Sequence, residues 1–292
     1  MNPDMDMILH ESTEKHVAQF TGQPSHAVLL VGSNGIGKAH IAEVMIANIL
    51  HIETDVLAAY PYYKRVHDEK GSISIETIRD LQRFLQLKTI GTKPIRRAVV
   101  VEHAEALTIE AQNAFLKILE EPPADTIILL TADNQRALLP TILSRVQIIP
   151  VYTPEEQTLK DHFARQGKEA TAILQAYFLS GGLPGLMTAL LDEDKAHPLL
   201  GGVATAKDIL QKQLFERLTL VEGLSKQKEE ATHVLQALQH IAQTGLRQAA
   251  AKQDPGKIKQ WHHVLQVTTE ASQALDQNAN AKLVLTNLML QL

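Results

Sequence analysis

The sequence predicts an α/β domain followed by helices alone. Four short apolar runs, rich in valine and isoleucine, occur in the first half of the chain: Ala27–Val31, Ala98–Val101, Thr126–Leu130 and Gln147–Val151. Segments with helical spacing separate these runs, which is the pattern of a parallel sheet covered by helices on both faces. After Thr153-Pro154 this strand pattern ends, and amphipathic helical segments alternate with Gly or Pro residues.

The first apolar run leads directly into a glycine-rich loop, Gly32-Ser-Asn-Gly-Ile-Gly-Lys38, and then into a segment with helical spacing. This is the context of a phosphate loop, whose backbone N–H groups converge on phosphate oxygens while lysine reaches the outer phosphates. The residues expected to bind phosphate are Gly32, Gly35, Gly37 and Lys38. The next residue is Ala39, at the position where a serine or threonine hydroxyl would bind magnesium, and a methyl group cannot do so.

The second apolar run ends in Glu102-His103. Hydrolysis by this type of site needs an acid that holds magnesium and usually a second carboxylate that prepares the attacking water. Glu102 fits the first role, but a histidine stands in the place of the second. We therefore expect hydrolysis to be disabled, with rescue by Glu105 as the open alternative. Residual nucleotide binding through Lys38 and the loop N–H groups also stays open.

A helix is expected between the second and third runs, and its ends are marked. Thr108 is a suitable N-cap, and Pro122-Pro123 would stop the helix. In the second half of the chain, the clearest breaks between helices are expected at Ser180–Gly185 and His197–Gly202. These signals divide the chain into three domains, residues 1–151, 152–202 and 203–292.

Two segments resemble the signature of bacterial clamp-loader subunits of the AAA+ class. They are Leu107–Pro123 and Leu138–Arg145, and the final segment Asn278–Leu292 resembles the closing helix of the collar domain of this family. The resemblance implies an AAA+ RecA-like sheet domain, a small helical lid domain and a C-terminal helical collar that joins subunits. It also implies gamma/tau and delta clamp-loader subunits, a sliding clamp and primed DNA as partners.

Within this family, the departures resemble the branch that does not hydrolyse ATP. They are Ala39, Glu102-His103, and Gly182-Leu-Pro-Gly185, which lacks the arginine of the gamma/tau motor subunit. The resemblance makes Arg145 of the Ser144-Arg145 motif an arginine finger that acts on a neighbour's ATP, a role suited to a planar and permanently charged guanidinium. The alternatives are an active gamma/tau-like ATPase and, less favoured, a DNA-binding scaffold that acts alone.

Composition excludes several other classes of protein. The chain has 292 residues, a net charge of −5 and no cysteine, which argues against disulfides, thiolate metal sites and a basic nucleic-acid binder. The 13 histidines form no pattern typical of a zinc site, so we expect no metal and no required cofactor. With no signal pattern and no apolar stretch of about 20 residues, we expect a cytoplasmic protein without a membrane partner.

A local group of basic residues leaves two interpretations open. Six arginines and lysines lie between residues 79 and 97, namely Arg79, Arg83, Lys88, Lys93, Arg96 and Arg97. They could contact duplex phosphates, or they could be a solvated helix face.

Overall fold

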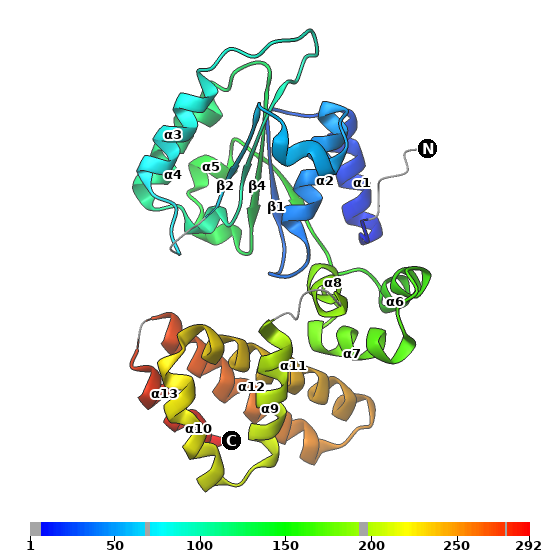
Figure 1. The fold of residues 1–292 in the computed structure, drawn as a ribbon, viewed down its shortest axis with the longest axis vertical. Helices are drawn as coiled ribbons and strands as arrows, with labels where there is room; N and C mark the ends of the chain where they lie inside the picture. The colour runs from blue at the N-terminus through cyan, green and yellow to red at the C-terminus, as the bar shows by residue number, and fades with distance from the viewer. Residues whose placement is uncertain (1–6, 68–70, 193–197, 278) are drawn as a thin grey trace. The chain divides into compact units, whose positions relative to one another are not determined.

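A computed structural model describes residues 7–67, 71–192, 198–277 and 279–292. The chain separates into two compact units, with the boundary between Glu155 and Glu156 (Figure 1). We describe each unit by itself. Among the described residues, no helix is both long enough and apolar enough to cross a membrane.

Unit 1, residues up to Glu155, contains a five-stranded parallel sheet in the order β2-β3-β4-β1-β5. The strands are β1 (Ala27–Val31), β2 (Tyr63–Val66), β3 (Arg97–Val101), β4 (Thr126–Ala132) and β5 (Gln147–Pro150). The longer helices are α1 (Glu11–Gly22), α2 (Lys38–Leu50), α3 (Ile75–Leu85) and α4 (Ile109–Glu120), and the short α5 spans Pro140–Leu143. Figure 1 shows α1 and α2 on one side of the sheet and α3 and α4 on the other.

The central strands are buried on both faces, which explains their unbroken apolar sequences. Leu29 and Val99 pack into the core beneath α3 and α4, together with Phe115 of α4. Their strand neighbours Val28 and Val100 point to the opposite face, because successive strand residues alternate, and they too are fully buried. The predicted α/β part of the fold is confirmed.

Helix α4 begins and ends where the sequence predicted. The Thr108 hydroxyl accepts a hydrogen bond from the Ala111 N–H at 3.2 Å, and the helix ends at Glu120. The buried Gln112 joins α4 to the chain that leads into α5. Its side-chain oxygen accepts from the Leu139 N–H at 2.8 Å, and its amide donates to the Ala137 carbonyl at 3.2 Å. This linkage fixes the first turn of α4 against the segment that leads into α5.

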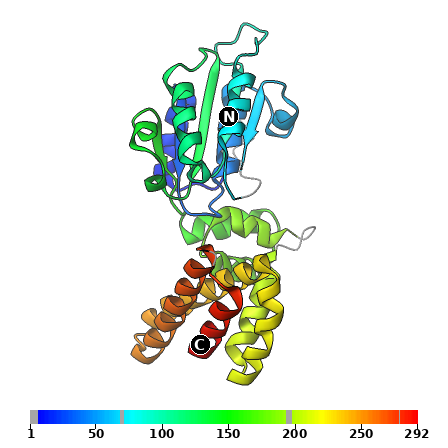
Figure 2. The same ribbon diagram turned by 90° about the vertical axis from the view of Figure 1, so that its left-hand side faces the viewer.

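Unit 2, residues from Glu156 onward, is helical. Its helices are α6 (Glu156–Arg165), α7 (Ala170–Ser180), α8 (Pro184–Leu191), α9 (Pro198–Gln211), α10 (Leu214–Lys226), α11 (Lys228–Ala251), α12 (Pro255–Asp276) and α13 (Ala281–Gln291). Helix α11 packs against both α9 and α12. Figure 2 shows α13, in red, between α10 in yellow and α12 in orange. The predicted change from α/β to all-α structure is confirmed.

One of the two predicted breaks in this half is right and the other is wrong. Gly181 and Gly182, with φ of 64° and 81°, end α7 before α8. By contrast, Gly201 and Gly202 lie within α9, while His197 lies outside the described residues. Gly202 serves packing, because a Cβ there would lie 2.8 Å from the His233 carbonyl of α11. The predicted boundary near residue 202 therefore falls inside a helix, and the division of unit 2 into a lid and a collar stays a prediction.

Candidate functional site

The predicted phosphate loop joins the carboxyl end of β1 to the start of α2. Gly32 permits the close approach of β5, since a Cβ on it would lie 2.6 Å from the Val151 carbonyl oxygen. Gly37 adopts a left-handed conformation, with φ of 98°, immediately before α2 begins at Lys38. The structure thus brings Gly32, Gly35, Gly37 and Lys38 together in one turn at this edge of the sheet.

The Lys38 ammonium group makes three contacts inside the protein. Only 6% of its side chain is exposed, and its Nζ lies 2.8 Å from the Gly32 carbonyl oxygen and 3.0 Å from that of Ser33. The third contact, at 2.6 Å, is an ion pair with Asp133, which follows β4. Because an ammonium group has three N–H donors, all of them are used by the chain itself.

The carboxylate of Glu102 is also paired. Glu102 is buried at the end of β3, and Nη2 of Arg65 lies 2.9 Å from this carboxylate. The same guanidinium lies 3.3 Å from Glu43 of α2. Beside this group, burial raises the pKa of Tyr63, and the negative charge of Glu43 adds to the rise. A positive charge therefore already compensates the acid that would hold magnesium in an active site.

His103 lies in a second group at the same edge of the sheet. Its backbone is left-handed, with φ of 48°, and its N–H donates to the Thr131 hydroxyl at 3.2 Å. Nδ1 of His103 lies 3.7 Å from Glu105, whose carboxylate accepts the Asp133 N–H at 2.9 Å. Potential ligand atoms of these three side chains lie within 4.8 Å of one another, and the Lys38 ammonium supplies a positive charge beside them. The absence of a bound metal stays a prediction.

Arg145 lies at the opposite edge of the sheet from the phosphate loop. It follows α5 and precedes β5, whose first residue, Gln147, pairs with Val28 near the beginning of β1. Nη1 donates to the Thr141 carbonyl at 3.0 Å and to the Ser144 hydroxyl at 3.2 Å. Nη2 lies 2.9 Å from Glu120, the last residue of α4. The sequence motif therefore forms a cluster, but this cluster is separate from the loop.

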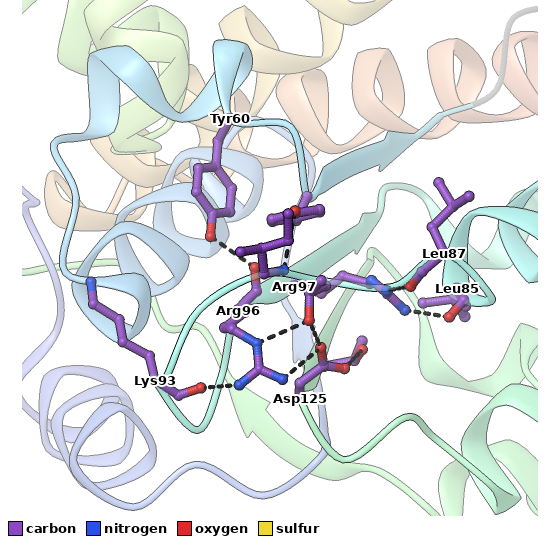
Figure 3. A network of polar contacts seen from close by, with 11 residues as sticks. Tyr60, Leu85, Leu87, Lys93, Arg96, Arg97 and Asp125 are labelled. Carbon is purple, nitrogen blue, oxygen red and sulfur yellow. Dashed lines mark hydrogen bonds and ion pairs between the residues drawn. The ribbon is translucent and has the colours of Figure 1, made fainter.

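The interpretation of Arg97 as a DNA contact is wrong, because this side chain is buried with 1% of its surface exposed. Its guanidinium donates to the carbonyls of Leu85 and Leu87 at the end of α3 (Figure 3). It also lies over the Phe84 ring. The contact with the two carbonyls compensates the negative end of the helix. Charge counting in the sequence could not reveal it.

Among the remaining basic residues of this region, some make internal hydrogen bonds and ion pairs, and the others are exposed to solvent. Arg96 pairs with Asp125 at 3.3 Å (Figure 3). Lys93 donates to the Leu50 carbonyl at 2.7 Å. Arg79 and Arg83 are exposed on α3, each beside an acid three residues earlier. Lys88 is also exposed. This pattern is that of a solvated helix face rather than a continuous basic patch.

Comparison with known proteins gives the family. Residues 11–155 match the family model described as "DNA polymerase III, delta subunit". DNA polymerase III subunit delta' of Pseudomonas aeruginosa is 35% identical over 181 residues, which are 56% of this chain and 54% of that protein. Over residues 11–155, the chain belongs to this DNA polymerase III family. Subunit delta' of Escherichia coli is 29% identical over 205 residues, 64% of this chain and 60% of the relative.

These family relatives are matched over only part of their length, since the chain spans between about half and three fifths of each. The fold extends further. A crystal structure of a DNA polymerase III gamma subunit-related protein from Thermotoga maritima has a TM-score of 0.51 at 20% identity, covering 96% of this chain and 98% of that one. The resemblance to AAA+ clamp-loader subunits, predicted from Leu107–Pro123 and Leu138–Arg145, is confirmed.

Proposed function

We propose that the chain is a clamp-loader subunit of the delta' type that does not hydrolyse ATP itself and lends Arg145 to ATP on a neighbouring gamma/tau subunit. In this proposal delta is a further subunit of the assembly, which works in the cytoplasm and helps to place the sliding clamp on primed DNA. The observation that carries the proposal is the position of Arg145 at the edge of the sheet opposite to the chain's own phosphate loop.

The length of the sheet supports an ATP on another subunit, and not one in the chain's own loop, as the nucleotide that Arg145 contacts. Strand residues advance about 3.3 Å each, so the five residues of β1 separate the two edges by about 16 Å. An arginine side chain does not span this separation and also meet a phosphate in its own loop. If Arg145 acts on ATP, that ATP belongs to another subunit, and hydrolysis there depends on assembly.

The state of the chain's own loop supports the second half of the proposal. Transferring a phosphoryl group requires a lysine, a magnesium ion and a prepared water to be positioned together. Here the donors of Lys38 are used by Gly32, Ser33 and Asp133, and Ala39 offers no hydroxyl for magnesium. Nucleotide could approach Lys38 only by competing with these internal contacts. The proposed subunit therefore needs no cofactor of its own.

The test is ATP hydrolysis by the chain alone and by its mixture with gamma/tau and delta subunits. Arg145→Ala should lower hydrolysis at the adjacent site by about 10³-fold or more, the range of other arginine fingers, without preventing assembly in size-exclusion chromatography. Lys38→Ala should change this rate little, and Arg83→Ala on the exposed face of α3 is the control. Steady magnesium-dependent hydrolysis by the isolated chain, lost in Lys38→Ala, would favour the gamma/tau-like ATPase instead.

A further inference from the structure

The contacts of Arg145 come from two sources that differ in kind. Those with the Thr141 carbonyl and the Ser144 hydroxyl are local, and they form wherever α5 ends in this turn. The contact with Glu120 comes from another helix, at 2.9 Å. This contact joins the guanidinium to an element other than its own.

Glu120 itself is held in place by the fold. It is the last residue of α4, and the helix is fastened at its other end, where Gln112 in the first turn bonds to the segment that leads into α5 through the Leu139 N–H and the Ala137 carbonyl. The carboxylate and the arginine therefore stand on elements that are fastened to each other. Such support from a rigid neighbour is what holds a functional side chain in one geometry.

The three contacts leave part of the guanidinium available. A guanidinium has five N–H donors in one plane, and Glu120, Thr141 and Ser144 accept three hydrogen bonds or ion-pair contacts. Two donors remain for a phosphate. The side chain of Arg145 is 36% exposed, so these donors can meet a partner without opening the domain.

We propose that Glu120 is a positioning residue for Arg145, which holds the guanidinium in the orientation that meets a neighbouring subunit's phosphate. This inference rests on the proposed function of Arg145. Ordering a long side chain before the partner arrives reduces the entropy lost at the moment of contact. A role in the stability of the chain alone is minor, because exposed ion pairs of this kind contribute little to folding.

The test compares Glu120→Ala with Glu121→Ala in the complex with gamma/tau and delta subunits. Both variants remove one negative charge, from adjacent and exposed side chains at the end of α4. Glu120→Ala should lower the maximal rate at the adjacent site about 2- to 5-fold, with the ATP concentration for half-maximal rate and the thermal unfolding temperature unchanged. Glu121→Ala should match the wild type. Glu120→Gln, which keeps an oxygen acceptor for Nη2, should recover most of the rate.

The double variant Glu120→Ala with Arg145→Ala separates the possible outcomes. If Glu120 acts through Arg145, the double variant should be no slower than Arg145→Ala alone. A further loss in the double variant, or equal rates for Glu120→Ala and Glu121→Ala, would overturn the positioning role while leaving the proposed function intact. If Arg145→Ala itself has no effect, the proposed function fails, and the role of Glu120 fails with it.

Discussion

Replacing Arg97 with methionine tests whether this arginine belongs to the fold or to a DNA-binding surface. Methionine keeps an unbranched apolar side chain over Phe84 but removes the donors to the Leu85 and Leu87 carbonyls. Each hydrogen bond from a charged group contributes about 1.5–3 kcal/mol, so the two together contribute about 3–6 kcal/mol. Part of this loss is recovered because a buried charge, whose Nε has no hydrogen-bond partner, is removed. We expect the free energy of unfolding of unit 1 to fall by about 2–4 kcal/mol.

Urea unfolding is monitored by far-UV circular dichroism, and the local stability of α3 and β3 is measured by amide hydrogen exchange. Fluorescence is less useful, because the single tryptophan, Trp261, belongs to unit 2. Arg83→Met is the matched control, since this side chain is 76% exposed. We expect its effect to stay within about 0.5 kcal/mol, as for other exposed positions.

Two results would refute this account of Arg97. If the amide hydrogens of α3 exchange at the same rate in Arg97→Met as in Arg83→Met, the buried contacts of Arg97 do not stabilise the end of this helix. If Arg97→Met instead leaves stability unchanged and weakens binding of the assembled complex to primed DNA, the rejected interpretation is correct. In the second case the loss of affinity would also depend strongly on salt, as phosphate contacts do.

Two further predictions concern unit 2. Burial lowers the pKa of His240 below its ordinary value of 6.5, so the unfolded chain binds this proton at a higher pH than the folded chain, and the free energy of unfolding should decrease as pH falls from about 7 towards 5. His240→Gln should make the free energy of unfolding, measured by urea titration, depend less on pH; the same pH dependence in variant and wild type would contradict the assignment. Gly245→Ala would place a Cβ 2.4 Å from the Trp261 ring, so it should lower stability by about 1–3 kcal/mol in spite of alanine's helix propensity. Gly223→Ala in α10, with open space around it, should instead raise stability, and parallel changes in the two variants would reject the packing argument.

The sequence predicted four of the five strands and missed β2, one of the two edge strands. Four runs of apolar residues became β1, β3, β4 and β5. The first three of these strands are central and have helices on both sides, whereas β5 lies at an edge and exposes Gln147 and Ile148. Strand β2, Tyr63–Val66, pairs only with β3 and has two basic residues among its four. Its sequence carries no continuous apolar signal, since an edge strand can expose part of its side chains to water. Arg65, which neutralises Glu102, was missed with it.

The sequence revealed the parts of the site that depend on contacts between neighbouring residues and missed those that depend on contacts between distant segments. The loop from Gly32 to Lys38 is a continuous motif, and its glycines are required by the local backbone and the approach of β5. Asp133 lies 95 residues from Lys38, and only the sheet order brings the carboxylate to the loop. Glu120 lies in a motif that resemblance could identify, but its contact with Arg145 follows from how α4 is fastened to α5.

The internal partners of Lys38 also affect what the proposed subunit can contribute to an assembly. In a loop that responds to ATP, the lysine ammonium exchanges its contacts as phosphate arrives and leaves. Here a 2.6 Å ion pair and two carbonyl contacts use its three N–H donors, and Glu105 accepts the backbone N–H of Asp133. A ligand shifts a conformational equilibrium only by its differential affinity for two states, so a loop that does not exchange these contacts transmits no nucleotide signal. Under the proposed function, Arg145 would then be presented to the neighbouring ATPase in the same geometry throughout the cycle, and control of hydrolysis would lie in whether the two subunits meet.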